Sequence, residues 1–270
     1  MKPVPSRRRR KRGEGASPLA VLLAMAATLF FVLPLVGLLG RTSWANVPSD
    51  LLAPEVRTAL RLSLVTSLLA TAVALVFGVP LAWILARRVF LGRRLLRAVT
   101  TLPMVLPPVV GGVALLFAFG RRGMLGGWLD SLGVRLPFTT AGAVTAEAFV
   151  AMPFLVITLE AAFRGMDRRY EDAARTLGAR RATVFRRVTL PLVAPALTAG
   201  TVLCWARALG EFGATITFAG NFPGTTQTMP LAVYIALESR PEQAITLSLV
   251  LLVVSMAVLV SLRDRWLGVS

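Results

Sequence analysis

Two ionisable residues lie four positions apart in an otherwise apolar run of this 270-residue chain. They are Arg207 and Glu211, which a helix would place on one face. Ionisable groups in such a run are costly to bury, and they usually pair with each other or line a route for ions. One interpretation is a mutual ion pair. The other is a pathway in which Arg207 attracts an anion and Glu211 holds the arginine in orientation.

The residue types needed for common enzyme chemistry are scarce. The chain has no histidine, a single cysteine, Cys204, and two lysines, Lys2 and Lys11. Ser-His and Cys-His nucleophiles, imidazole or thiolate metal sites and an intrachain disulfide are therefore excluded. Neither lysine lies in a G-x-x-x-x-G-K-[ST] loop, so the chain has no Walker motif for ATP. Ser-Lys chemistry or paired carboxylates would remain for an enzyme, but no carboxylates cluster in the apolar runs. We expect no catalytic residue, no metal site and no cofactor bound by this chain.

Six long apolar runs must position these residues. Hydrophobic residues make up 56% of the chain, more than in a soluble domain. The first run, Leu19–Leu39, has no charge and would be about 31 Å long as a helix, enough to cross the hydrocarbon of a bilayer. Open strands cannot satisfy their backbone in lipid, so the sequence predicts an all-α polytopic membrane protein with six transmembrane helices. The other runs are Leu62–Leu85, Leu102–Phe119, Ala141–Phe163, Pro191 to about Phe218, and Ala244–Leu262.

The net charge of +17 is concentrated in alternate connections between the runs. The N-terminal tail carries 7 lysines or arginines, residues 87–97 carry 5, residues 164–187 carry 8 and the C-terminal tail carries 2. With six spans these segments fall on one side, so the positive-inside rule places both termini in the cytoplasm. The basic run Arg7–Arg12 is interpreted as a topology and anionic-lipid signal, with a membrane-anchored nucleic-acid-binding protein as an alternative.

The first run also has an alternative interpretation as a cleaved signal peptide. Its length exceeds the roughly 7 to 15 residues of a signal-peptide core, and five more runs follow, so we interpret it as a retained anchor. The expected organisation is a basic cytoplasmic tail (1–17), a first transmembrane helix with an external loop (18–54), a core of five transmembrane helices (55–262) with a cytoplasmic loop at 164–190, and a cytoplasmic tail (263–270).

The cytoplasmic loop 164–190 is predicted to contain a short helix. Asp167 can cap its start and Gly178 can end it. Such a short helix is marginal alone and would be stabilised in a partner's cleft, although periodicity by itself favours a solvated surface helix. Leu190-Pro191 would then restart the chain as the fifth span, since proline is tolerated in a first turn. Four residues recur at the spacing of one helix face: Tyr170, Ala173, Ala174 and Leu177.

The third run contains residues that disturb a regular helix: Pro107, Pro108, Gly111 and Gly112. They could form irregular backbone that lines a cavity, or they could allow close packing of helices through small residues. Both interpretations stay open.

The loop has a recognisable spacing of an acid and two alanines, three residues, glycine, nine residues, a β-branched aliphatic, one residue and Leu-Pro. This resembles the signature of permease subunits of ATP-binding-cassette importers. In that family the segment is the coupling helix, which docks into a groove of the cytoplasmic ATPase subunit. Asp172 stands where the family usually has glutamate, and Val188 where it has isoleucine. The resemblance implies these ATPase-coupling residues: Asp172, Ala173, Ala174, Leu177, Gly178, Val188, Leu190 and Pro191.

Other segments, over roughly residues 55–262, resemble molybdate importer permeases. They include Gly210-Glu211-Phe212-Gly213-Ala214-Thr215 and Leu106-Pro107-Pro108-Val109-Val110. Permeases for sulfate and tungstate share part of this pattern. A translocation pathway is therefore expected near seven residues: Arg207, Glu211, Gly213, Thr215, Pro107, Pro108 and Gly111.

The resemblance implies a type I importer transmembrane fold in the cytoplasmic (inner) cell membrane. The implied partners are a second copy of this chain, two ATP-binding subunits that use the ATP, an extracytoplasmic molybdate-binding protein and membrane lipid, with no nucleic acid. A sulfate/thiosulfate or tungstate importer is the alternative substrate class. A secondary transporter is a different class, for which no convincing inverted repeat is evident.

Overall fold

The computed structural model describes residues 17–266, with side chains described up to residue 257. The predicted tails therefore lie largely outside the described residues, including the run Arg7–Arg12 and residues 267–270. Within residues 17–266 every regular element is helical, as predicted. The elements are α1 (Pro18–Gly40), α2 (Val47–Leu52), α3 (Pro54–Arg87), α4 (Arg93–Thr101), η1 (Leu102–Met104), α5 (Pro108–Phe119), α6 (Gly126–Ser131), α7 (Thr140–Gly165), α8 (Arg169–Thr176), α9 (Arg181–Val184), η2 (Phe185–Thr189), α10 (Leu190–Leu209), α11 (Gly213–Phe218), α12 (Met229–Ser239) and α13 (Pro241–Trp266).

The chain divides into two units, and the first ends at Thr42. Its single helix, α1, is the charge-free run. Ser17 caps the start, since its hydroxyl accepts a hydrogen bond from the Ala20 amide at 3.2 Å, and Pro18 occupies the first turn. None of the α1 side chains is buried, as expected of a helix whose apolar surface is left for lipid on all sides.

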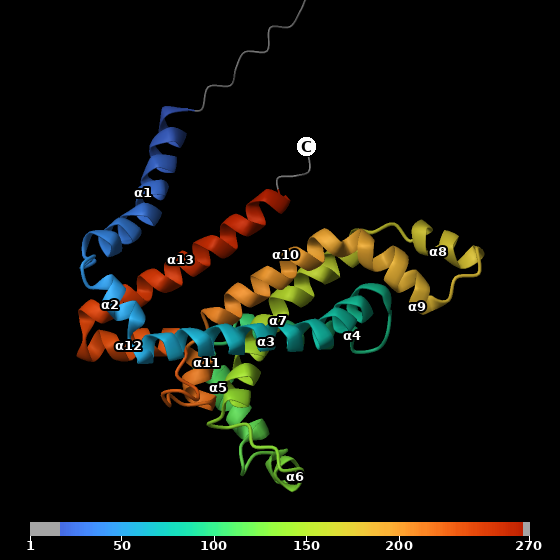
Figure 1. The fold of residues 1–270 in the computed structure, drawn as a ribbon. Coiled ribbons are helices and arrows are strands. Elements are labelled where there is room, and N and C mark those ends of the chain that lie inside the picture. Colours follow the sequence, from blue (N-terminus) through green and yellow to red (C-terminus); the bar gives the residue numbers. More distant parts are fainter. Residues whose placement is uncertain (1–16, 267–270) are drawn as a thin grey trace, which may run out of the picture. The chain divides into compact units, whose positions relative to one another are not determined.

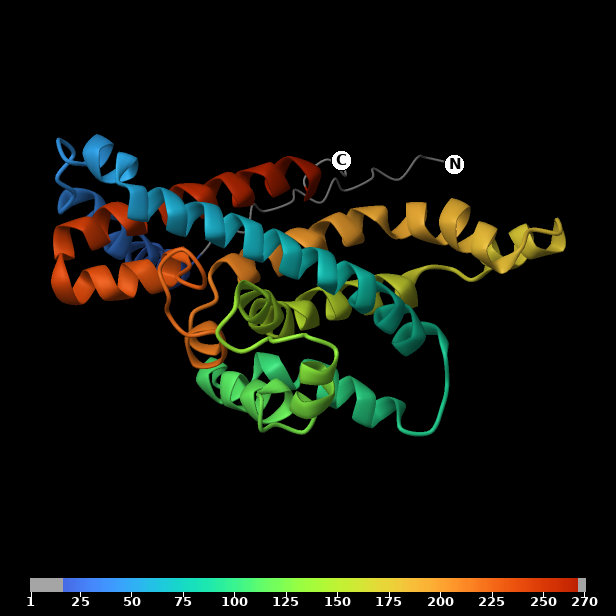
Figure 2. The same cartoon turned by 60° about the horizontal axis from the view of Figure 1, so that its bottom comes forward.

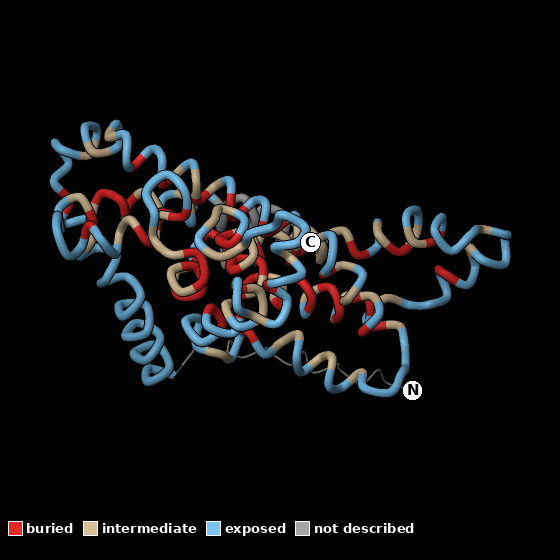
Figure 3. Tube along the Cα trace, turned by 90° about the horizontal axis from the view of Figure 1, so that it is seen from below, coloured by how far each residue is buried: buried red, intermediate tan, exposed pale blue. Residues whose placement is uncertain are grey.

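The second unit, from Ser43 onward, has its core where α3, α7 and α10 pack together. Small residues allow this approach, as in other membrane helix bundles. A β-carbon on Gly78 of α3 would lie 3.3 Å from Met152 and Val156 of α7, and one on Gly200 of α10 would lie 3.2 Å from Leu155. Figure 3 shows buried residues concentrated in this bundle.

Polar side chains on the buried face of α3 tie it to three other helices. The Thr66 hydroxyl donates to Glu147 Oε1 of α7 at 2.8 Å. Ser67 Oγ accepts from the Trp205 indole of α10 at 3.0 Å, and Ser63 Oγ accepts from the Met229 amide of α12 at 2.6 Å. Hydrogen bonds in an apolar interior fix the register of helices that small residues alone would leave free to slide.

Four helices among the described residues are long and apolar enough to span a membrane, or five if a bent pair counts as one span. The four are α1, α3, α7 and the continuous helix Arg181–Leu209. The bent pair corrects the predicted third span, Leu102–Phe119. The chain bends by 119° between Arg93–Met104 and Pro108–Phe119, because Pro107 and Pro108 remove backbone donors and Pro108 forces its predecessor into an extended conformation.

The predicted fifth span is wrong at both ends. Its helix begins at Arg181 rather than Pro191, and it passes through one wide turn, η2, before continuing as α10. Pro191 lies inside this continuous helix, where the preceding wide turn accommodates the missing donor. At the other end α10 stops at Leu209 and the chain restarts as α11. Helix α12 was not expected, and α13 begins three residues before the predicted Ala244.

The described part of the second unit has two distinct ends. Helices α8 and α9 form one end, beside the C-terminal ends of α3 and α7 (Figures 1 and 2). Helix α2 and the turn between α12 and α13 lie at the other. The predicted coupling loop and the start of the permease core are thus separated by the length of the bundle.

Candidate functional site

Helix α8 in the coupling segment is delimited by local hydrogen bonds at both ends. At its start the N-cap position is Arg168, one residue after the predicted Asp167, and the Asp167 carboxylate accepts from the Arg169 amide at 2.9 Å. At its end the Gly178 amide donates to the Arg175 carbonyl at 2.9 Å and the Ala179 amide to the Ala174 carbonyl at 3.1 Å, a Schellman arrangement. Gly178 has φ +82°, the left-handed conformation that glycine adopts without strain.

The residue that anchors α8 to the bundle is Glu171, which the sequence reasoning missed. Glu171 is buried, and its Oε1 accepts from the Thr189 hydroxyl at 2.7 Å and lies 3.7 Å from Arg87 Nη2 at the end of α3. Asp172, which the sequence reasoning chose, is exposed and pairs only with Arg175, at 3.4 Å, among the described ion pairs. The acid one position earlier therefore connects α8 with α3 and η2.

The opposite face of α8 is apolar and exposed. Leu177 is 89% exposed and Tyr170 58% exposed, and Ala173 beside them is exposed too. Ala174 is half-buried. The predicted face therefore exists, and within this chain its apolar side chains remain available to a partner.

The remaining coupling residues lie on the continuous helix that follows. Val188 and Leu190 are half-buried, and Pro191 is exposed. Because Thr189 binds Glu171, this wide turn is directly joined to α8. Movement of α8 would accordingly act on the start of the long helix Arg181–Leu209.

A second polar cluster lies at the break between α10 and α11, where this long helix ends. Arg207 Nη2 lies 2.6 Å from Glu211 Oε2, and Glu211 Oε1 accepts from the Ala214 amide in the first turn of α11 at 2.8 Å. The structure therefore confirms the predicted ion pair between Arg207 and Glu211. Glu211 also caps α11, and it is 1% exposed, whereas the Arg207 side chain is 28% exposed. The carboxylate therefore holds two helices across the break.

Helix α5 packs closely against α11 at this break. A β-carbon on Gly112 would lie 2.6 Å from Thr217 and 2.9 Å from the Ala214 carbonyl oxygen, and one on Gly213 would lie 2.8 Å from Pro108. Gly111 is buried against the ring of Phe149. The small residues thus serve helix packing, and the prolines interrupt the backbone just before it.

The structure brings some of the predicted pathway residues together. Pro108, Gly213 and Glu211 lie at the junction of α5, α10 and α11, and Pro107 and Pro108 are exposed there. Thr215 is fully buried inside the chain. The role of these residues in translocation stays a prediction.

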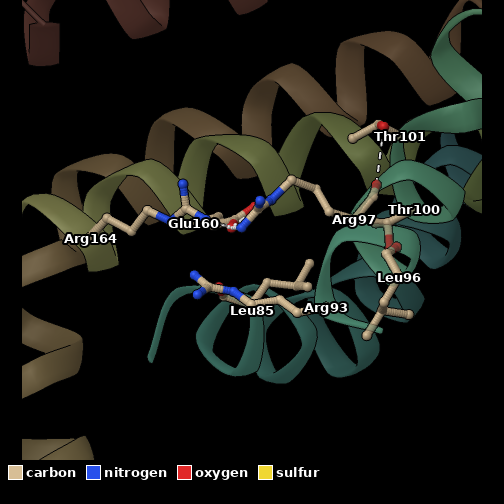
Figure 4. A network of polar contacts seen from close by, with 8 residues as sticks. All are labelled: Leu85, Arg93, Leu96, Arg97, Thr100, Thr101, Glu160 and Arg164. Carbon is tan, nitrogen blue, oxygen red and sulfur yellow. Dashed lines mark hydrogen bonds and ion pairs between the residues drawn. The ribbon is translucent and has the colours of Figure 1, made fainter. Parts of the chain in front are cut away.

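Two further carboxylates in α7 were not predicted as site residues from the sequence, although each interrupts the apolar run Ala141–Phe163. Glu147 is 1% exposed and bonded to Thr66. Glu160 lies between two guanidinium groups: its Oε1 is 2.6 Å from Arg97 Nη2 and 2.6 Å from Arg164 Nη2 (Figure 4). This network joins α4 to α7, while Arg93 donates to the Leu85 carbonyl of α3 at 2.8 Å.

Comparison with known proteins identifies the family. The family described as binding-protein-dependent transport system inner membrane component matches residues 78–269, which include the whole coupling segment and the helix break. The chain belongs to this family. It is accordingly a multi-pass protein of the inner membrane component type, and its relatives are transporter permeases rather than enzymes.

Individual members of the family align over nearly the whole chain. The molybdenum transport system permease protein ModB of Mycobacterium tuberculosis is 46% identical, with 90% of this chain and 92% of the relative covered. The sulfate transport system permease protein CysT of Escherichia coli K12 is 36% identical, with 89% and 90% covered. A crystal structure of a bacterial alginate ABC transporter, solved with its alginate-bound periplasmic protein, superimposes with a TM-score of 0.74 at 18% identity, covering 90% and 91%. This last likeness shows the importer transmembrane fold.

Proposed function

We propose that this chain is the membrane-spanning permease subunit of an ATP-driven importer that carries molybdate into the cell. The observation that carries the proposal is the 46% identity to a molybdenum permease over 90% of the chain. A dianion such as molybdate cannot cross hydrocarbon unaided, so it needs a pathway whose two ends open in turn. The sequence has no Walker motif, so the energy must come from a separate ATP-binding chain.

Coupling is assigned to α8. Its exposed face, with Tyr170, Ala173 and Leu177, would dock into the ATPase subunit, while Glu171 on the other face keeps α8 attached to α3 and η2. ATP binding would draw two such helices together, and the long helix Arg181–Leu209 would carry the movement to the junction with α5 and α11. Hydrolysis would reverse it.

The proposed assembly has two copies of this chain around one pathway, two ATP-binding subunits beneath them and an extracytoplasmic molybdate-binding protein above. Six spans are proposed, with the bent pair α4–α5 as one span and α13 as the last. Both termini would then be cytoplasmic. The tail 1–17 would be followed by the first transmembrane helix and an external loop (18–54), the permease core (55–262) and the tail 263–270.

The pathway is assigned to the junction of α5, α10 and α11. In this proposal Arg207 gives the junction positive potential and Glu211 orients the guanidinium, which the 2.6 Å pair and the partial exposure of Arg207 support. Sulfate/thiosulfate or tungstate is the alternative substrate, since a sulfate permease is 36% identical. A secondary transporter would differ in needing no ATPase at all.

The test is uptake of labelled molybdate into vesicles that contain this chain with its ATPase and binding protein. We expect ATP-dependent uptake that excess tungstate blocks and excess sulfate does not. Equal block by sulfate would move the assignment to the sulfate importers. Uptake in vesicles without the ATPase would support a secondary transporter, and no uptake would contradict oxyanion import.

A further inference from the structure

A cavity of about 660 Å³ lies behind α8, between the end of α3 and the segment from α8 to η2. We call it the arginine pocket. Its walls come from two segments, residues 80–88 and 168–189, that are about eighty residues apart in the sequence. The fold therefore creates the cavity. Five arginines line it: Arg87, Arg88, Arg168, Arg175 and Arg181.

Positive charge exceeds negative charge in the arginine pocket. Among the described residues that line it, two are acids, Glu171 and Asp172. Asp172 pairs with Arg175 at 3.4 Å, and Glu171 is 3.7 Å from Arg87. In the described part of the chain no carboxylate lies within 4 Å of the other three guanidinium groups, those of Arg88, Arg168 and Arg181.

One of the arginines is buried with a donor unused. The Arg87 side chain is 7% exposed, and its Nε has no hydrogen-bond partner among the described residues. Its Nη2 reaches the Met166 carbonyl only at 3.5 Å and Glu171 only at 3.7 Å. Glu171 Oε1 is already committed to Thr189 at 2.7 Å. A buried guanidinium N–H without an acceptor is costly, so an acceptor from outside the chain is expected in the pocket.

Apart from Thr189, the rest of the lining is apolar and aromatic. Trp83 and Phe185 meet edge to face with ring centroids 6.5 Å apart, and the Arg88 guanidinium lies 5.7 Å from the centroid of the Trp83 ring. Pro80, Ala182 and Val184 also belong to this wall. A basic rim beside an apolar wall at the end of membrane helices is the surrounding that a phosphate group with an attached acyl chain would favour.

We propose that the arginine pocket binds a phosphate group. Planar guanidinium forks match tetrahedral phosphate oxygens, and the Arg87 Nε–H would gain the acceptor it lacks. The source is an anionic lipid headgroup or free phosphate, which share this chemistry. A bound phosphate would bridge α3 to α8 next to the Glu171 contact, and so it would stiffen the segment assigned to ATPase docking. This binding goes beyond the proposed import function and does not depend on which oxyanion is carried.

Native mass spectrometry of the purified full-length chain tests the proposal. The probes are dioctanoyl phosphatidylglycerol, the zwitterionic dioctanoyl phosphatidylcholine, and inorganic phosphate. We expect retention of phosphatidylglycerol over phosphatidylcholine. The variant Arg88→Gln/Arg168→Gln should weaken binding roughly tenfold, since it removes charge-assisted hydrogen bonds. The control Arg121→Gln/Arg122→Gln makes the same charge change in the exposed loop between α5 and α6 and should bind like the unchanged chain.

Competition by phosphate separates the two sources. If millimolar phosphate displaces phosphatidylglycerol and is itself retained, free phosphate is the ligand; if it does not, the lipid headgroup is. Equal weakening in both double variants would mean diffuse attraction to a basic surface and would overturn the proposal. Failure to bind both phosphatidylglycerol and inorganic phosphate would overturn it too. Thermal unfolding checks that the variants are folded, and Arg88→Gln alone replaces the double variant if that one is not.

Discussion

Glu171 and Asp172 are adjacent acids with opposite surroundings. The first is buried between Thr189 and Arg87, and the second is exposed beside Arg175. Removal of a carboxylate that compensates a buried guanidinium costs far more stability than removal of one from an exposed pair, because it leaves the buried charge without a partner. The two positions therefore separate a structural role from a docking role within a single turn of helix.

Replacement of each acid by alanine should give different stabilities. Glu171→Ala leaves Arg87 buried without its carboxylate, at a cost of about 3 kcal/mol, so we expect the unfolding midpoint to fall by roughly 6 to 12 °C. Asp172→Ala, the matched control, should shift it by less than about 2 °C. The measurement is thermal unfolding of the detergent-solubilised chain. Equal midpoints for the two variants would contradict the anchoring role of Glu171.

Arg207 and Glu211 should behave as a coupled pair. Arg207→Ala leaves a 1% exposed carboxylate unpaired, and Glu211→Ala also removes the cap of the Ala214 amide. We expect the double variant to be more stable than the sum of the single losses implies, by at least about 1 kcal/mol. Thermal unfolding of all four proteins gives this coupling, and strictly additive losses would mean that the pair adds no stability.

Uptake by the same variants addresses the pathway assignment. If Arg207 attracts the anion, Arg207→Ala should lose uptake even where the protein is folded, and Arg207→Lys should retain part of it. Full uptake by Arg207→Ala would leave the ion pair with a structural role alone.

At the scale of elements, the contact between α5 and α11 depends on a missing side chain. Gly112→Ala would place a β-carbon 2.9 Å from the Ala214 carbonyl oxygen, which the backbone cannot easily move, so the two helices must separate. We expect a loss of roughly 1 to 3 kcal/mol and reduced uptake. Gly127→Ala in α6 meets nothing within 4 Å and should change the unfolding midpoint little. Unchanged stability and uptake in Gly112→Ala would refute the close contact.

The end of α8 offers a test of coupling. Gly178 has φ +82° and open space around it, so a substitution acts through the backbone rather than through a clash. Gly178→Val should distort the docking segment and uncouple ATP hydrolysis by the complex from uptake. Gly178→Asn should preserve coupling, because asparagine tolerates the left-handed conformation. Full coupled transport by Gly178→Val would argue against docking through this turn.

The sequence predicted helices where their signal is local. Long apolar runs located α1, α3 and α7, and Asp167 and Gly178 located α8. The interruption between α10 and α11 was harder to predict, because residues 210–212 lie within an apolar stretch. Hydropathy does not show that the Glu211 carboxylate accepts a hydrogen bond from the Ala214 amide and so caps α11. Pro191 suggested a helix start, but the chain was already helical from Arg181. The contact of Arg87 with Glu171 joins residues 84 positions apart, and no local pattern encodes it.

At the scale of the whole molecule, the proposed topology places Leu177 in the cytoplasm and Met124, in the loop after α5, outside. Both are about nine-tenths exposed, and the native Cys204 is fully buried. In cells that carry Met124→Cys, a membrane-impermeant thiol reagent should label the protein directly. Leu177→Cys should be labelled only after permeabilisation. The opposite pattern would invert the assigned orientation.

The unbroken helix Arg181–Leu209 has a mechanical consequence. Its 29 residues span roughly 40 Å at about 1.5 Å per residue, with the docking segment at one end and the Glu211 junction at the other. As a stiff lever that pivots near one end, it would turn a tilt of about 5° into a displacement of roughly 3.5 Å at the far end. A small change of angle at the ATPase would thus move the junction by more than an atomic diameter, without any hinge inside the bundle.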